Sequence, residues 1–240
     1  MLELNMVRER CLVSNLCIIT ARGGSKRIPR KNIKEFLGKP IIAYSIEAAI
    51  MSGIFDEVMV STDDKEIAEV SKRYGASIPF FRSAATSNDY ATTADVLNEV
   101  LDQYERKGRS FDFFSCVYPT APFVTAEKLK AAFVKLQESD ADALTPVIPF
   151  SYPPQRAFVI KEGGLVYQYP EYRRARSQDL EPIYHDCGQF YFYRTSSFRA
   201  GQTEKNLPLI MPEEETQDID NFSDWELAEV KYKRFILKEN

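Results

Sequence analysis

Long apolar runs are absent from this sequence of 240 residues. No stretch approaches the roughly 20 consecutive apolar residues that a membrane-spanning helix needs, so we expect no membrane partner. Residues 1–15 carry mixed charge and no apolar segment, and we expect them to form a disordered leader rather than a secretory signal. The 44% hydrophobic and 28% charged content is typical of a globular protein.

Cysteine and histidine are scarce. Cys11, Cys17, Cys116 and Cys187 lie far apart without a C-x-x-C pair. This spacing indicates neither a disulfide framework nor a zinc site, and it fits the reducing cytoplasm. The only histidine is His185, and a lone histidine is more often a hydrogen-bonded structural residue than a catalyst.

The chain also lacks an excess of positive charge. Its formal net charge of −4 argues against a general nucleic-acid binder, which is usually basic. Residues 22–34 nevertheless hold six basic side chains and no acid, directly after the apolar run 16–20. Gly23 and Gly24 would let backbone amides approach a ligand closely. The combination suits a polyphosphate, although charge alone also fits a solvated turn.

Helical and strand-like patterns alternate along the chain. This alternation predicts an α/β fold with a doubly wound, mostly parallel sheet. Ligands bind such sheets at the carboxyl ends of the strands, where the basic segment falls. We expect strands at residues 16–20, 56–61, 78–81, 113–118 and 143–148, and helices at 39–51, 62–74, 93–107 and 125–139.

The basic segment belongs to neither common phosphate-binding motif. Residues 19–33 read ITARGGSKRIPRKNI, without a G-x-x-x-x-G-K-[ST] or G-x-G-x-x-G pattern. They closely resemble the signature of the acylneuraminate cytidylyltransferases, which make CMP-activated nine-carbon sugar acids. The resemblance implies a Rossmann-like nucleotidyltransferase domain over residues 16–149 and 188–240. It also implies that a sugar hydroxyl attacks the α-phosphate of CTP and releases pyrophosphate.

The resemblance assigns residues to the nucleotide. Arg82 would contact the cytosine, although Ser83 stands where the family usually has proline. Alternatively, this stretch is a polar loop in which Asp89 or Thr92 caps the next helix. The expected nucleotide-binding residues are Ala21, Arg22, Gly23, Gly24, Ser25, Lys26, Asn32, Arg82, Ala91 and Thr93, and the expected catalytic residues are Arg22, Lys26, Lys31, Asn32, Asp218 and Asp220.

Other positions concern the sugar. Sialic acid members of the family have a glutamine where this chain has Tyr118, and that glutamine contacts the sugar. Residues 176–191 include RSQDL and YHDCGQFY, which look like the pseudaminic acid branch. Sialic acid, legionaminic acid and 3-deoxy-manno-octulosonate remain alternatives. The expected sugar-binding residues are Tyr118, Arg176, His185, Gln189 and Tyr191.

Residues 150–187 interrupt the alternation with prolines, tyrosines and arginines. The stretch is too long for an ordinary connection. The resembled family uses this region as a dimerisation arm that completes the partner's sugar site, so we expect an insertion of this kind and a homodimer. Arg176 aligns with a family arginine and could bind a sugar carboxylate, or it could belong to a solvated face.

Asp218 and Asp220 stand two residues apart on an extended segment and therefore project to the same side. Two carboxylates can hold Mg²⁺ together with substrate phosphates, or they can simply be solvated. The resemblance implies that both are magnesium ligands, and we expect Asp224 to cap a last helix reaching about residue 238. A non-catalytic nucleotide- or RNA-binding module stays open as a different class of function.

Overall fold

The computed structural model describes residues 13–239, so most of the expected leader, residues 1–15, lies outside the described residues. The prediction was wrong for the last three leader residues. Asn15 is buried and begins strand β1, Asn15–Thr20. The backbone amide of Ser14 donates to the carboxylate of Asp112 at 2.8 Å. These contacts hold the residues in the fold.

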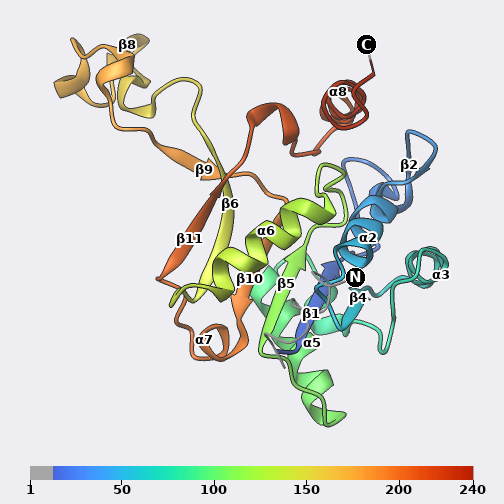
Figure 1. Cartoon of the computed structure of the whole chain (residues 1–240). Coiled ribbons are helices and arrows are strands. Elements are labelled where there is room, and N and C mark those ends of the chain that lie inside the picture. Colours follow the sequence, from blue (N-terminus) through green and yellow to red (C-terminus); the bar gives the residue numbers. More distant parts are fainter. Residues whose placement is uncertain (1–12, 240) are drawn as a thin grey trace.

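A seven-stranded sheet forms the centre of the described chain, in the order β11-β6-β10-β5-β1-β4, with β9 also paired to β6 (Figure 1). Strand β1 runs parallel to β4 and β5, whereas β10 runs antiparallel to β5 and β6. Strands β6 and β11 therefore share the direction of β1, which confirms the mostly parallel sheet. The bounds are β4 Glu57–Ser61, β5 Phe113–Val117, β6 Ala143–Pro149, β9 Tyr184–Asp186, β10 Phe190–Arg194 and β11 Asn206–Ile210.

The strand expected at residues 78–81 does not form. Ser77 makes only an isolated bridge with Met59, and its amide donates to Val58 O at 2.8 Å. Pro79 has no N–H to donate to a neighbouring strand, so the pairing ends after this one contact.

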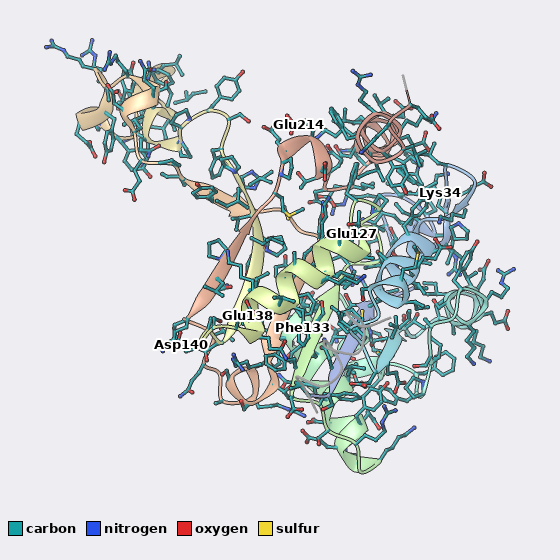
Figure 2. All side chains as sticks on the ribbon, in the orientation of Figure 1. Lys34, Glu127, Phe133, Glu138, Asp140 and Glu214 are labelled. Atoms are coloured by element: carbon teal, nitrogen blue, oxygen red, sulfur yellow. The ribbon has the colours of Figure 1, made fainter. Side chains whose placement is uncertain are left out.

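Helices cover both faces of the sheet. Cys17 and Ile19 of β1 pack with α2, α3 and α6, while Leu16 and Ile18 pack with α5 on the opposite face. Phe133 of α6 lies against the sheet (Figure 2). No helix within residues 13–239 is both long and apolar enough to cross a bilayer. The helices are α2 Ile41–Ser52, α3 Lys65–Arg73, α4 Ala84–Ser87, α5 Thr93–Arg106, α6 Ala126–Gln137, α7 Thr195–Arg199 and α8 Phe222–Lys231.

The last helix differs from the expectation at both ends. Asn221, not Asp224, is its N-cap: the Asn221 side chain accepts from the Asp224 amide, and the Asp224 carboxylate accepts from the Asn221 amide, both at 3.0 Å. Asp224 is thus the second member of a capping box. Beyond α8 a single π-helical turn, η6 (Tyr232–Ile236), ends the regular structure.

The insertion leaves the body after β6 as a projecting arm (Figure 1). Its antiparallel hairpin consists of β7, Phe158–Lys161, and β8, Gly164–Tyr167. The chain rejoins the sheet at β9, before the expected boundary at residue 187. Short 3₁₀ turns make up much of the rest, namely η2 Pro154–Arg156, η3 Pro170–Tyr172 and η4 Ser177–Asp179.

A third apolar cluster joins segments that are distant in sequence. Ile28 of the basic segment and Ile219, between the two aspartates, are both fully buried in it. Their shared anchoring places the basic segment beside the C-terminal aspartates. The other buried members are Phe36, Ile41, Tyr44, Phe123, Trp225 and Ala228, contributed by β2 (Glu35–Phe36), α2, α8 and the segment before α6.

Candidate active site

Three parallel strands end at the same edge of the sheet, and each is followed by polar residues. We call residues 21–32 after β1 the basic loop, and residues 62–64 after β4 the β4–α3 turn. Strand β5 is followed by Tyr118. A cleft of about 490 Å³ opens at this edge, lined by Thr20, Arg22, Ser25, Lys26, Arg27, Lys31, Asn32, Tyr118, Pro119, Thr120, Asp218 and Asp220.

All six residues expected to be catalytic line this one cleft, together with Ser25 and Tyr118. The expected site residues did not include Thr20, Arg27, Pro119 and Thr120. Arg27 could have been found because it lies within the basic run. Thr20 and Thr120 follow the same rule as the other site residues, since both stand at the carboxyl ends of central strands.

A hydrogen bond from Asn32 links the two ends of the basic loop. The buried Asn32 side chain donates to Arg22 O at 2.9 Å. Ser25 Oγ donates to Ile28 O at 2.6 Å, and the Ile28 side chain is buried below the loop. Asn32, expected to face the reacting groups, therefore also shapes the loop.

Gly23 is required by a contact within the protein. Its amide donates to Asp63 Oδ1 at 2.9 Å, and a Cβ at this position would lie 2.9 Å from Asp64 Oδ2. Close approach to the β4–α3 turn thus explains this glycine. A Cβ at Gly24 would meet no atom of residues 13–239 within 4 Å.

Three of the four cleft cations, Arg22, Lys26 and Arg27, are paired with carboxylates. Asp89 accepts from Arg22 at 3.0 Å and from Lys26 at 2.6 Å, and Arg27 donates to Asp220 at 2.6 Å. Such exposed pairs contribute little to stability, because water and salt screen them. An incoming polyphosphate can therefore replace Asp89 at little cost.

Asp218 and Asp220 face the cleft because Ile219 between them turns into the core. Partial burial, and then the neighbouring Asp220, raise the pKa of the Asp218 carboxyl. Lys31 donates to Ile219 O at 2.7 Å, and burial lowers the pKa of its ammonium group. No cluster of three or more potential metal ligands occurs within residues 13–239. A metal ion in the cleft would therefore have two protein carboxylates, those of Asp218 and Asp220, as ligands.

The residues expected around the cytosine lie outside the cleft lining. Arg82 is buried, and its guanidinium donates to Ser61 Oγ at 3.1 Å and to Ser61 O at 2.7 Å. Ala91 donates its amide to Asn88 Oδ1 at 3.0 Å. Thr92, one of the two expected caps, is the N-cap of α5.

Tyr118 lines the cleft and packs against Tyr191, which is not among the lining residues. The Tyr118 hydroxyl contacts the side chains of Thr93 and Tyr191, and the two tyrosine rings meet edge to face at 5.6 Å. Tyr191 donates to Asp186 Oδ2 at 2.6 Å, and burial together with this contact raises the pKa of Tyr191. Three of the expected ligand-binding residues are thereby brought together.

Gln189, His185 and Arg176 do not line the cleft. Gln189 is buried and donates to Glu215 O at 3.2 Å. His185 lies on β9 with its ring 4.6 Å from that of Phe150. Arg176 is 71% exposed on the projecting arm, where it pairs with Asp179 at 2.7 Å.

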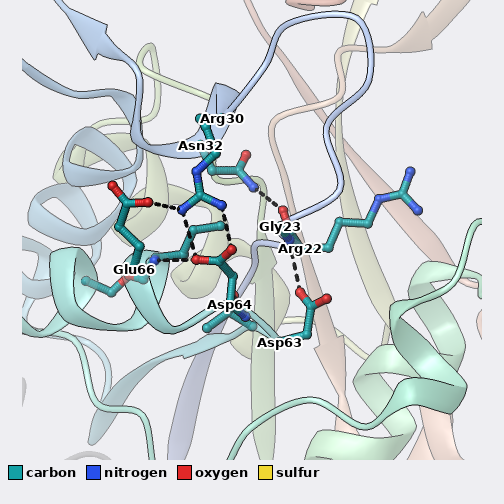
Figure 3. A network of polar contacts seen from close by, with 10 residues as sticks. Arg22, Gly23, Arg30, Asn32, Asp63, Asp64 and Glu66 are labelled. Carbon is teal, nitrogen blue, oxygen red and sulfur yellow. Dashed lines mark hydrogen bonds and ion pairs between the residues drawn. The ribbon is translucent and has the colours of Figure 1, made fainter.

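Arg30 is the basic-loop residue that turns away from the cleft. Its guanidinium donates to Asp64 Oδ1 at 2.9 Å and Oδ2 at 2.5 Å, and it also contacts Glu66 (Figure 3). This bidentate pair holds the pKa of Asp64 at about 2, well below its ordinary value.

The Arg30–Asp64 pair should make folding stability depend on pH. An aspartate in the unfolded chain has a pKa of about 3.9, so the stabilising contribution is complete above that pH and is lost as pH falls toward 2. Since Arg30 is 39% exposed, we expect Asp64→Asn to lower the free energy of unfolding by only about 1 kcal/mol at neutral pH. Urea unfolding should show this difference shrinking in acid; a difference independent of pH would contradict the assignment.

Comparison with known proteins identifies the family. The model of the cytidylyltransferase family matches residues 16–211. A pseudaminic acid cytidylyltransferase of Campylobacter jejuni is 43% identical over 225 residues, which cover 92% of this chain and 97% of the relative. A CMP-N,N'-diacetyllegionaminic acid synthase of Legionella pneumophila is 35% identical, covering 89% of this chain and 94% of the relative.

Solved structures agree on the fold. A CMP:2-keto-3-deoxy-manno-octonic acid synthetase in complex with CTP superposes with a TM-score of 0.67 at 18% identity, over 90% of this chain and 97% of that protein. The family match excludes the non-catalytic binding module left open by the sequence. The chain belongs to the cytidylyltransferase family and is a nucleotidyltransferase.

Proposed function

We propose that this enzyme transfers CMP from CTP to the anomeric hydroxyl of a nonulosonic acid, specifically pseudaminic acid, and releases pyrophosphate. The observation that carries the proposal is the cleft in which basic-loop cations face Asp218 and Asp220, in a chain 43% identical to a pseudaminic acid cytidylyltransferase. Legionaminic and sialic acid are the alternative substrates, because synthases for both are also relatives.

The protein acts by positioning and charge neutralisation. Arg22 and Lys26 exchange Asp89 for the triphosphate, and Lys31 adds a third cation beside it. The anomeric oxygen then forms its bond to the α-phosphorus in line with the breaking bond to pyrophosphate. Neither step needs a covalent enzyme intermediate.

Asp218 and Asp220 fit a magnesium ion. Both carboxylates line the cleft, and the pKa of Asp218 is raised first by burial and then by the like charge of Asp220, both of which a bound cation would offset. Mg²⁺ commonly takes one or two carboxylates plus substrate phosphates, and when bound it would offset charge on the phosphate oxygens.

We also propose a homodimer and a cytoplasmic location, each supported by one further feature. The arm exposes Ile160 at 76% and Leu165 at 71%, and we propose that it forms a homodimer interface. Light scattering after size-exclusion chromatography should give twice the chain mass, and a monomer would contradict the interface. The buried free thiols of Cys17, Cys116 and Cys187 suit the reducing cytoplasm.

The substrate is tested by pyrophosphate release from CTP and Mg²⁺ with pseudaminic, legionaminic and sialic acids in parallel. We expect kcat/KM to be highest with pseudaminic acid. Preference for another acid would retain the reaction and overturn the substrate. If folded protein that binds CTP releases no pyrophosphate with any of the three acids, the proposal of a nonulosonate acceptor is overturned.

Replacing Lys26 with alanine should raise KM for CTP about tenfold, because one charged contact to the triphosphate is lost. KM for the sugar acid should stay nearly unchanged. Lys34→Ala is the matched control, because Lys34 lies outside the cleft (Figure 2). Its ammonium nitrogen is 5.6 Å from the centre of the Phe222 ring. Equal increases in both KM values for the Lys26 variant would contradict this division of roles.

A further inference from the structure

The basic loop is attached to the β4–α3 turn at both of its ends. Near its start, the Gly23 amide donates to Asp63; near its end, the Arg30 guanidinium binds Asp64. Figure 3 shows both contacts, with Arg30 turned toward α3 and the Arg22 side chain extending the other way. The two anchoring carboxylates are consecutive in the chain.

Asp64 is itself held firmly. It is the N-cap of α3, where Oδ1 accepts from the Ile67 amide at 3.0 Å, and Oδ2 is left to Arg30 Nη1. The first residue of the turn contributes as well, because Thr62 Oγ1 accepts from the Asp64 amide at 3.1 Å. The carboxylate therefore has little freedom to follow a moving loop.

The loop needs such anchoring for two reasons. It carries four cations toward one cleft, and their mutual repulsion, partly offset by Asp89 and Asp220, favours spreading apart. Arg30 also adopts a left-handed conformation with φ of 56°, which is strained for a non-glycine residue. Such a conformation persists where surrounding contacts over-determine it, as the bonds to Asp64 and Glu66 do here.

We propose that Asp63 and Asp64 are positioning residues for cytidylyl transfer: by fastening both ends of the basic loop to the start of α3, they set Arg22, Lys26 and Lys31 in place before CTP binds. A preformed loop avoids an ordering cost when the nucleotide arrives. Misplacement of reacting groups by about 1 Å can lower the rate about a hundredfold. The inference rests on the proposed function where turnover is the readout, whereas CTP binding tests it separately.

Asp64→Asn is the first variant, because asparagine keeps the N-cap of α3 and removes only the charge that binds Arg30. We expect Kd for CTP, measured by calorimetry without sugar, to rise about tenfold and kcat to fall about tenfold. KM for the sugar acid should not change. Glu69→Gln, which removes one exposed charge from the same helix, is the matched control and should behave as wild type.

Asp63 allows a test by conservative rescue. Asp63→Ala removes the acceptor for the Gly23 amide and should weaken CTP binding, whereas Asp63→Asn keeps an oxygen acceptor and should restore most of it. Hydrogen exchange of residues 22–31 should accelerate in Asp63→Ala and Asp64→Asn alike. Unchanged exchange in folded variants would overturn the anchoring role.

A double-mutant cycle separates positioning from general stability. Arg30→Gln and Asp64→Asn should each lose about the same CTP affinity, and the double variant should lose no more than either single variant. If the losses of CTP affinity in the two single variants add up fully in the double variant, the Arg30–Asp64 pair is not what positions the loop. A lowered melting temperature with wild-type kcat and CTP affinity would mean a purely structural role and would overturn the proposal.

If wild-type enzyme turns over none of the acids offered, the proposed function fails. The CTP calorimetry then still decides whether Asp63 and Asp64 position the loop.

Discussion

Asp220→Ala is expected to lower kcat at least about a hundredfold at saturating CTP and Mg²⁺, the scale of losing one strong electrostatic contact in a transition state. Asp220 lines the cleft beside Asp218, and alanine leaves one carboxylate for the proposed metal. Pyrophosphate release over a range of Mg²⁺ concentrations should show both the lower rate and a weaker dependence on the metal.

The control must show whether the lower kcat of Asp220→Ala comes from a lost metal ligand or simply from the loss of one negative charge. Glu226→Gln removes one exposed negative charge from α8, close to Asp220 in sequence, and should retain wild-type turnover. Near-normal turnover of Asp220→Ala with Mg²⁺ would refute the metal assignment. Release of Arg27 from its ion pair cannot account for a large loss, because exposed pairs contribute little.

Gly23→Ala is the second substitution with a large expected effect. The new Cβ would lie 2.9 Å from Asp64 Oδ2 and 3.1 Å from Asp64 Cβ, and Asp64 is held by α3 and Arg30. The basic loop must therefore move. We expect kcat/KM for CTP to fall about a hundredfold and the free energy of unfolding to fall by about 1–3 kcal/mol.

The neighbouring glycine provides the matched control. A Cβ at Gly24 meets open space, and Gly24 does not adopt a positive φ, so Gly24→Ala should change stability by less than about 0.5 kcal/mol. Weaker CTP binding in this stable variant would place the nucleotide against Gly24. Wild-type stability and kinetics in Gly23→Ala would contradict the close approach to Asp64.

Much of the fold and site could be predicted because the responsible patterns are local. The apolar run of β1 followed by glycines and cations placed the basic loop at the carboxyl edge of a parallel sheet. The alternation of Asp218, Ile219 and Asp220 placed two carboxylates on one side. The structure brings these segments into one cleft, and the buried side chains of Ile28 and Ile219 are the physical reason.

Other features depended on contacts between distant segments. The strand expected at residues 78–81 fails because Pro79 cannot continue the pairing. The prediction that Gly23 and Gly24 turn amides toward a ligand did not foresee that the Gly23 amide binds Asp63, some 40 residues later. Similarly, a run of six basic residues does not reveal that Arg30 faces α3, since the carboxylate that draws it away belongs to another turn.

The sequence by itself determined the fold class, the family and the set of charged residues that meet at the cleft, because strand and loop patterns and the 19–33 motif are contained in short stretches. The tertiary structure alone decided which basic side chains face the cleft and which one anchors the loop. That division depends on where the β4–α3 turn presents Asp63 and Asp64, and no local pattern in the basic loop records their position.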